Sequence, residues 1–124
     1  MNPRSAKQKG RSFQQAIRDL FLRFSNGLLE KDDVRSTSMG AGGEDILFSP
    51  AARRMYPYSV ECKNTERLNI WKAIEQAKEN AAGYIPMVAF RKNHHEAWIA
   101  VPADKFMELV HGNTRGEGSD AEDK

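Results

Sequence analysis

Alternating polar and apolar side chains between residues 58 and 64, in the run Tyr-Ser-Val-Glu-Cys-Lys-Asn, constrain the fold of this chain most strongly. Successive side chains of a β-strand point to opposite faces, so Glu61 and Lys63 would share one face and Val60 and Cys62 the other. Exposure to solvent alone does not require an acidic side chain beside a basic one on the same strand face. The pattern therefore predicts a strand that is packed on one face and carries a functional site on the other.

A further carboxylate, Asp45, begins the preceding apolar run Asp-Ile-Leu-Phe. If that run forms the neighbouring strand, the carboxylate of Asp45 can meet that of Glu61. Two close carboxylates repel each other unless a cation lies between them, and hard oxygen ligands suit Mg²⁺ or Mn²⁺. We therefore expect Asp45, Glu61 and the backbone carbonyl of Cys62 to bind such a cation. By itself the Glu-x-Lys spacing also fits a simple cross-strand salt bridge.

Length and cysteine content narrow the class of protein. The chain has 124 residues, which suffices for one hydrophobic core but not for two. Its single cysteine, Cys62, excludes an internal disulfide and fits a reducing compartment. On the apolar face of a strand, this cysteine would be a small buried hydrophobe rather than a nucleophile. Without a signal-peptide pattern or a long apolar run, we expect a soluble, cytoplasmic protein of a bacterium or phage-infected cell, with no membrane partner.

Hydrophobic periodicity predicts a mixture of helices and strands. Helices are expected at residues 12–25, 51–55, 67–82 and 102–111, and strands at residues 45–49, 58–63, 86–90 and 97–101. Strands grouped with helices in this order predict an α/β fold, with a mixed central β-sheet flanked by helices. Three segments follow from the pattern: a flexible basic arm at residues 1–11, one domain at 12–111 and a disordered acidic tail at 112–124.

Several clusters of basic and polar residues leave two interpretations open. The basic residues of the first segment, Lys9 and Arg11 among them, either lie along a phosphate backbone or belong to a solvated terminus. The pair Arg53 and Arg54 either grips a phosphate or forms the solvent side of a short helix.

Two further segments are open in the same way. Arg91 and Lys92, with two nearby histidines, either form a basic loop that touches phosphates or a plain polar turn. Ser36 and Ser38 either hydrogen-bond to phosphate oxygens or only cap and turn their loop.

The order of these motifs resembles the PD-(D/E)XK nuclease superfamily. Gly-Glu-Asp45 is followed by Glu61-Cys62-Lys63 and then by a helix that carries Gln76, although Glu44 stands where proline often stands. Within the superfamily the chain is similar to archaeal-type and phage Holliday-junction resolvases. That similarity rests on the stretch 34–40, on Lys9-Gly10 before the first helix and on the small size, and it covers about residues 9–110.

The resemblance implies a restriction-endonuclease-like core and a Mg²⁺-dependent (or Mn²⁺-dependent) DNA endonuclease. Asp45 and Glu61 would bind the metal, Lys63 would be catalytic, and Gln76 would help to shape the catalytic site. A homodimer is implied as well, because a four-way junction is cut on two strands. Under this interpretation the residues expected to contact DNA, branched or duplex, are Lys9, Arg11, Arg35, Ser36, Ser38, Arg53, Arg54, Arg91 and Lys92.

One departure from the resolvase pattern lies on the first helix. The resolvases carry a glutamate there that reaches the metal, whereas this sequence has Gln14 and Gln15 in the matching region. This difference leaves an alternative from another class, a DNA-binding module with a nuclease fold but no catalysis. A protein–protein adaptor, in which Glu61 and Lys63 form an ordinary salt bridge, is a third hypothesis.

Overall fold

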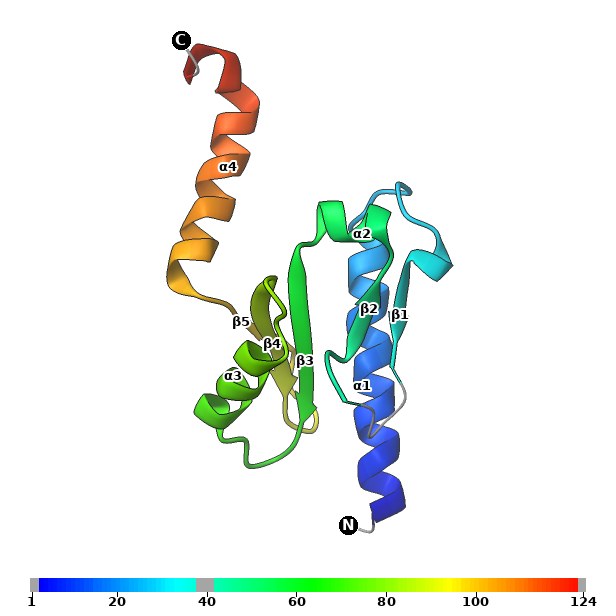
Figure 1. Cartoon of the computed structure of the whole chain (residues 1–124). Coiled ribbons are helices and arrows are strands. Elements are labelled where there is room, and N and C mark those ends of the chain that lie inside the picture. Colours follow the sequence, from blue (N-terminus) through cyan, green and yellow to red (C-terminus); the bar gives the residue numbers. More distant parts are fainter. Residues whose placement is uncertain (1–2, 38–41, 123–124) are drawn as a thin grey trace.

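The computed structural model describes the backbone of residues 3–37 and 42–122, and the side chains of residues 5–37 and 42–112. Its elements, in chain order, are α1 (Pro3–Arg23), the 3₁₀ helix η1 (Lys31–Asp33), β1 (Val34–Ser36), β2 (Ile46–Phe48), α2 (Pro50–Met55), β3 (Tyr58–Asn64), α3 (Ile70–Glu79), β4 (Ile85–Arg91), β5 (Trp98–Ala100) and α4 (Ala103–Glu122). Figure 1 shows the arrangement of these elements.

The described strands form an antiparallel pair, β1-β2, and a three-stranded mixed sheet, β3-β4-β5. In the larger sheet β3 and β4 are parallel and β5 is antiparallel to β4. The two groups meet where the N–H of Asp45 donates a hydrogen bond of 2.8 Å to the carbonyl of Val60. A mixed α/β fold flanked by helices is thus confirmed, but the strands divide into two groups instead of one central sheet. The hydrogen-bonded ladder of β2 covers only three residues, because proline and a helix follow at once.

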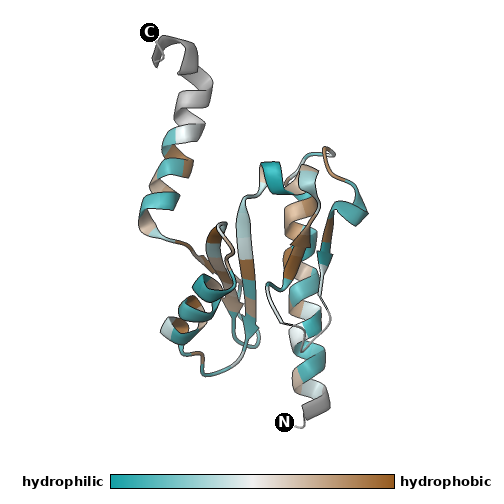
Figure 2. Ribbon diagram, viewed as in Figure 1, coloured by the Kyte–Doolittle hydropathy of each residue, from teal (hydrophilic) through white to brown (hydrophobic). Residues whose placement is uncertain are grey.

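Helices α1 and α3 cover opposite faces of the three-stranded sheet (Figure 1). Val60 of β3 and its partner Met87 of β4 belong to the apolar cluster that includes α1. The next partner on β4, Val88, packs instead with Ala73 and Ala77 of α3. In Figure 2 much of the ribbon of β2, β4 and β5 is brown (hydrophobic), whereas the ribbon of α3 is mostly teal (hydrophilic). The alternation of faces along β3 therefore decides which residues meet which helix.

Most expected elements are present, with three differences at the helices. The first helix was expected to begin at Ser12, which is wrong, because α1 begins at Pro3. The added segment is rich in good helix formers, and the buried side chains of Phe13 and Ile17 anchor the helix to the core. Helix α3 begins only at Ile70, after Asn69, whose side chain accepts a hydrogen bond from the backbone of the first turn. Helix α4 continues to Glu122, past the expected end near residue 111.

The strand β1 was not expected, because it lies in a charged segment followed by serines and glycines. Its register pairs Val34 with Phe48 and Ser36 with Ile46. Val34 is fully buried against α1, so a single apolar side chain secures this short strand. Within the described residues, no helix is both long and apolar enough to cross a bilayer.

Candidate active site between β2 and β3

The two faces of β3 have the residues that the alternation predicts. Val60 is fully buried and Cys62 packs against the same apolar cluster, on the side of α1. Ser59 and Glu61 face α3, where the hydroxyl of Ser59 donates a hydrogen bond of 3.1 Å to the carbonyl of Asn80. Glu61 is 2% exposed although it is ionisable. The strand therefore carries a buried acid toward the helix that follows it in the chain.

Asp45 is held at the edge of β3 by two hydrogen bonds. Its N–H donates to the carbonyl of Val60 at 2.8 Å, and its Oδ2 accepts from the N–H of Cys62, also at 2.8 Å. Gly43, two residues earlier, has a φ of +87°, a left-handed conformation that glycine adopts without steric cost. Gly43 thus allows the backbone to turn shortly before Asp45, whose carboxylate takes the place of a neighbouring strand's carbonyl as acceptor for the Cys62 N–H.

Burial and a neighbouring negative charge perturb the carboxyl of Glu61. Burial is the largest cause that raises its pKa to about 7, and the negative charge of Asp45 is the second. The ammonium of Lys63 and a hydrogen bond from the Asn80 side chain act in the opposite direction. The Nζ atom of Lys63 lies 3.9 Å from Oε2 of Glu61. Two carboxyl groups and one cation therefore interact across a small, largely desolvated region.

The carboxyl of Asp45 is perturbed in the same direction as that of Glu61. Its pKa is raised by burial, while the hydrogen bond from Cys62 and the charge of Lys63 lower it. Burial, together with the two carboxylates, also raises the pKa of the Cys62 thiol. A protonated, packed thiol is the state expected of a small hydrophobe and not of a nucleophile.

The donor atoms fit a hard divalent cation. Oε1 of Glu61 is buried and has no hydrogen-bond partner among the described residues, a costly arrangement unless another group satisfies it. In the part of the chain with described side chains, no group of three or more His, Cys, Asp or Glu residues is placed to hold a metal. Mg²⁺ usually keeps several waters and needs only one or two carboxylates. Asp45 and Glu61 meet that requirement, with the Cys62 carbonyl as the further oxygen expected from the sequence.

Asn80, the C-cap residue that follows α3, reaches the site, and sequence reasoning missed it. Its side chain hydrogen-bonds to Glu61 and donates to the Gly43 carbonyl at 3.4 Å. Gln76, the residue expected from α3, is exposed and lies one turn earlier on the same helix face. That spacing of four residues was the signal available in the sequence. The role of Gln76 stays a prediction.

Arg53 is engaged inside the protein. One guanidinium nitrogen donates to the Tyr58 carbonyl at 2.6 Å and another lies 3.0 Å from a carboxylate oxygen of Glu44. The guanidinium carbon also lies 4.0 Å from the ring centroid of Tyr84. Arg53 thus links α2 to β3 through Tyr58 and also holds Glu44, which precedes Asp45. Its neighbour Arg54 is exposed.

The other residues expected to contact DNA are dispersed. Arg11 on α1 and Arg35 on β1 are exposed, Ser36 is half-buried and Ser38 lies outside the described residues. Lys9 of α1 and Arg91 of β4 line one common groove, whereas Lys92 lines an adjacent one. DNA contact by all of them stays a prediction.

The two glutamines of α1 differ in their surroundings. Gln14 is 4% exposed and its Oε1 has no hydrogen-bond partner among the described residues, whereas Gln15 is exposed. A buried amide on α1 therefore lies where the resolvase resemblance predicts a glutamate, and that correspondence stays a prediction.

The described residues bring Asp45, Glu61 and Lys63 together at the edge of β3, with Asn80 beside them. Comparisons of the chain with protein-family models, with curated proteins and with solved structures found no match.

Proposed function

We propose that this protein is a Mg²⁺-dependent (or Mn²⁺-dependent) DNA endonuclease of the PD-(D/E)XK superfamily, with a restriction-endonuclease-like core. The observation that carries the proposal is the hydrogen bond from Cys62 to Asp45, because it sets this carboxylate beside Glu61 and Lys63. The element order supports it as well: α1 is followed by β2, which Asp45 immediately precedes, then by β3, which holds Glu61, and then by α3. We propose further that the protein acts in the cytoplasm as a homodimer on branched or duplex DNA, like Holliday-junction resolvases.

Each residue of the site has a chemical task in this proposal. Asp45 and Glu61 would hold the cation, which when bound activates water and offsets negative charge on the phosphate. Lys63 is part-exposed, so its ammonium can reach a phosphodiester while it stays beside Glu61. There the ammonium orients the attacking water or offsets charge that develops on the phosphate, whereas only the neutral amine form of Lys63 would accept a proton from that water. Asn80 positions the carboxyl of Glu61 by its hydrogen bond.

Cleavage of defined DNA substrates tests the proposal. Wild-type protein, Asp45→Ala and the control Glu75→Gln are incubated with Mg²⁺ and labelled four-way, duplex and single-stranded DNA. Glu75 is an exposed glutamate of α3, so its substitution removes a carboxylate without touching the site. We expect cleavage by the wild type and the control only. Equal cleavage by wild type and Asp45→Ala would show that a contaminant is responsible and would refute the proposal.

Gln14 favours a second candidate, a DNA-binding module with the same fold and no catalysis. A neutral, buried amide in place of a glutamate supplies no negative charge to a cation. Calorimetry with Mg²⁺ and Mn²⁺ separates the two candidates. DNA binding without metal uptake supports the module, whereas a metal isotherm that disappears in Asp45→Ala contradicts it.

A further inference from the structure

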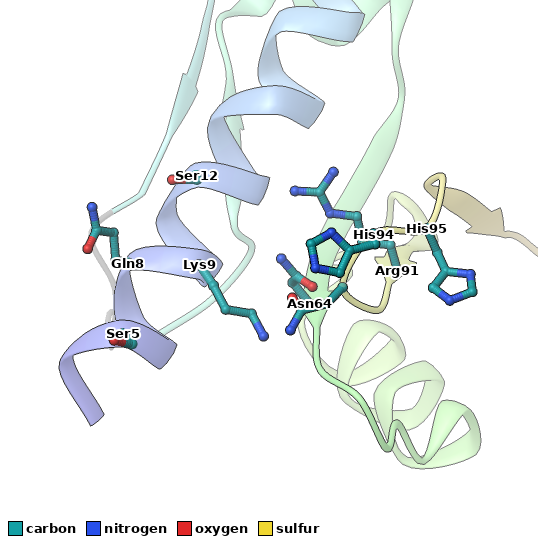
Figure 3. Close-up of a pocket in the computed structure, with 9 residues that line it drawn as sticks. Ser5, Gln8, Lys9, Ser12, Asn64, Arg91, His94 and His95 are labelled. Carbon is teal, nitrogen blue, oxygen red and sulfur yellow. The ribbon is translucent and has the colours of Figure 1, made fainter. Parts of the chain in front are cut away.

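A basic groove lies between the N-terminal half of α1 and the turn that joins β4 to β5. It has a volume of about 530 Å³, and its lining includes Lys9, Asn64, Arg91, His94 and His95. Figure 3 shows Lys9 reaching from α1 toward Asn64, with Arg91 and His94 on the other side of the opening. All its described lining residues are basic or uncharged, so the groove has a positive potential that suits an anion.

The groove is separate from the carboxylates but close to them along the chain. Asn64 follows Lys63 directly on β3, and successive side chains of a strand point to opposite faces. Lys63 therefore lies on the α3 side of the sheet and Asn64 on the α1 side. Arg91 is the register partner of Asn64 on β4. The groove thus opens at the same end of β3 as Lys63, around the edge of the sheet from the proposed catalytic site.

Several contacts hold the lining residues in place. The guanidinium of Arg91 lies 4.8 Å from the ring centroid of buried Phe13, which supports it on its apolar side. Oδ1 of Asn64 is buried without a hydrogen-bond partner among the described residues. The backbone of His94 has a φ of +63°, so the turn that carries its imidazole is in the left-handed region. Glu66, an acid close to this turn, accepts a hydrogen bond of 2.7 Å from the Asn93 N–H and does not line the groove.

We propose that this groove binds a backbone phosphate of the DNA that the Asp45–Glu61–Lys63 site acts on. The inference rests on the proposed function, since it names a second point of contact for the same substrate. Guanidinium and ammonium groups are the side chains that bind phosphates most strongly, and Arg91 and Lys9 supply one of each. The DNA strand then passes around the end of β3, from Lys63 on one face to the groove on the other. Such a path directs the scissile phosphate toward Lys63.

Salt-dependent DNA binding measures the contact without catalysis. Each variant is made in an Asp45→Asn background and titrated into labelled duplex DNA, in EDTA, over a range of KCl concentrations. Lys9→Ala removes one cation from the groove, and Lys7→Ala is the matched control, because Lys7 is an exposed lysine of the same helix outside the groove. We expect the slope of log affinity against log salt to become shallower by about 0.9 in Lys9→Ala and to stay unchanged in Lys7→Ala.

A second variant and a modified DNA guard against misfolding effects. His94→Gly removes the imidazole, and glycine tolerates the positive φ of this turn. We expect it to weaken DNA binding by the Asp45→Asn parent, because it removes a polar ring from the lining of the groove. A set of duplexes then carries one neutral methylphosphonate each, at successive positions along both strands. At one position, the methylphosphonate should weaken binding by the Asp45→Asn parent but leave binding by Lys9→Ala unchanged.

The outcomes separate this inference from the proposed function. If Lys9→Ala retains the parent slope and no methylphosphonate position is specific to Lys9, the groove proposal is wrong, even if wild-type protein cleaves DNA. If the slope changes as expected but wild-type protein never cleaves, the groove contact stands and the endonuclease proposal is wrong. If the parent fails to bind DNA at low salt, both are overturned.

Discussion

The carboxylate of Asp45 accepts a hydrogen bond of 2.8 Å from the backbone N–H of Cys62. The N–H of Asp45 donates in turn to the carbonyl of Val60, so this one residue continues the ladder along the edge of β3 that β4 does not occupy. The side chain therefore serves the fold through Oδ2, and Oδ1 takes no part in this bond. A substitution at Asp45 that keeps an oxygen acceptor for the Cys62 N–H should therefore affect the fold less than one that removes it.

Asp45→Asn should separate these two effects. Asparagine keeps an oxygen that accepts from Cys62 but removes the negative charge that repels Glu61. We expect this variant to be at least as stable as the wild type at pH 8 and to lose Mn²⁺ binding and DNA cleavage. Asp45→Ala should lose about 1–3 kcal/mol of unfolding free energy as well, because the Cys62 N–H is left unpaired. Urea unfolding in EDTA measures the stability of each variant, and calorimetry measures its Mn²⁺ binding. If Asp45→Asn bound Mn²⁺ with wild-type affinity, the proposed metal site would be contradicted.

The stability of the metal-free protein should fall as pH rises, because of Glu61. Its pKa in the folded protein, about 7, lies above the ordinary value of 4.5, so folding favours the protonated form. The resulting stabilisation is fully present below pH 4.5 and is lost as pH rises through about 7. A shift of this size corresponds to about 3 kcal/mol.

Glu61→Gln tests this pH dependence, because glutamine keeps the shape of the protonated acid. We expect wild type and variant to have similar unfolding free energies at pH 5 in EDTA, and the variant to be the more stable at pH 8. Urea titrations at several pH values check this, with Glu75→Gln as a control at an exposed position. A constant difference between wild type and Glu61→Gln at all pH values would contradict the perturbed pKa.

Lys63→Met should abolish cleavage without loss of DNA binding. The ammonium lies 3.9 Å from Glu61 and lowers the pKa of that carboxyl, so its removal should also raise the Glu61 pKa further. Loss of a group that transfers protons or offsets charge at the reacting phosphate costs roughly 10²–10⁴-fold in rate. Single-turnover cleavage measures the rate and anisotropy measures binding. Lys78→Met, at an exposed lysine of α3, is the control, and a rate for Lys63→Met within threefold of the wild type would refute a catalytic role.

Arg53→Ala should unfold the protein more easily, whatever its effect on DNA. It leaves the Tyr58 carbonyl and the Glu44 carboxylate without the guanidinium that now binds both. Charge-assisted hydrogen bonds of this kind contribute about 1.5–3 kcal/mol, and Arg53→Lys should recover only part of that, since it lacks the planar fork. Arg54→Ala, on the exposed side of α2, should change the unfolding free energy by less than about 0.5 kcal/mol. Equal stability of the two alanine variants would contradict the structural role of Arg53.

Short-range patterns in the sequence determined much of this structure. The polar–apolar alternation of residues 58–64 is a local property of an extended chain, so it predicted that Glu61 and Lys63 share one face of β3 and that Cys62 packs on the other. Ser49 before Pro50 likewise predicted the start of α2, where the Ser49 hydroxyl accepts from the Ala52 N–H at 3.1 Å. Such features depend on neighbours within a few residues, and these are visible in the sequence itself.

Only the tertiary structure decided which distant residues meet. The hydrogen bonds that hold Asp45 against Val60 and Cys62 join segments with no local signal for each other, and so does the end of α3 that brings Asn80 to Glu61. The same holds for Lys9 of α1 and Arg91 of β4, which line one groove although a long stretch of chain separates them. The start of α1 at Pro3 could not be predicted either, because burial of Phe13 and Ile17 stabilises a helix whose first turns carry no apolar pattern. The sequence determined the faces of its elements, while the packing of those faces determined the site, since burial energy depends on contacts between remote parts of the chain.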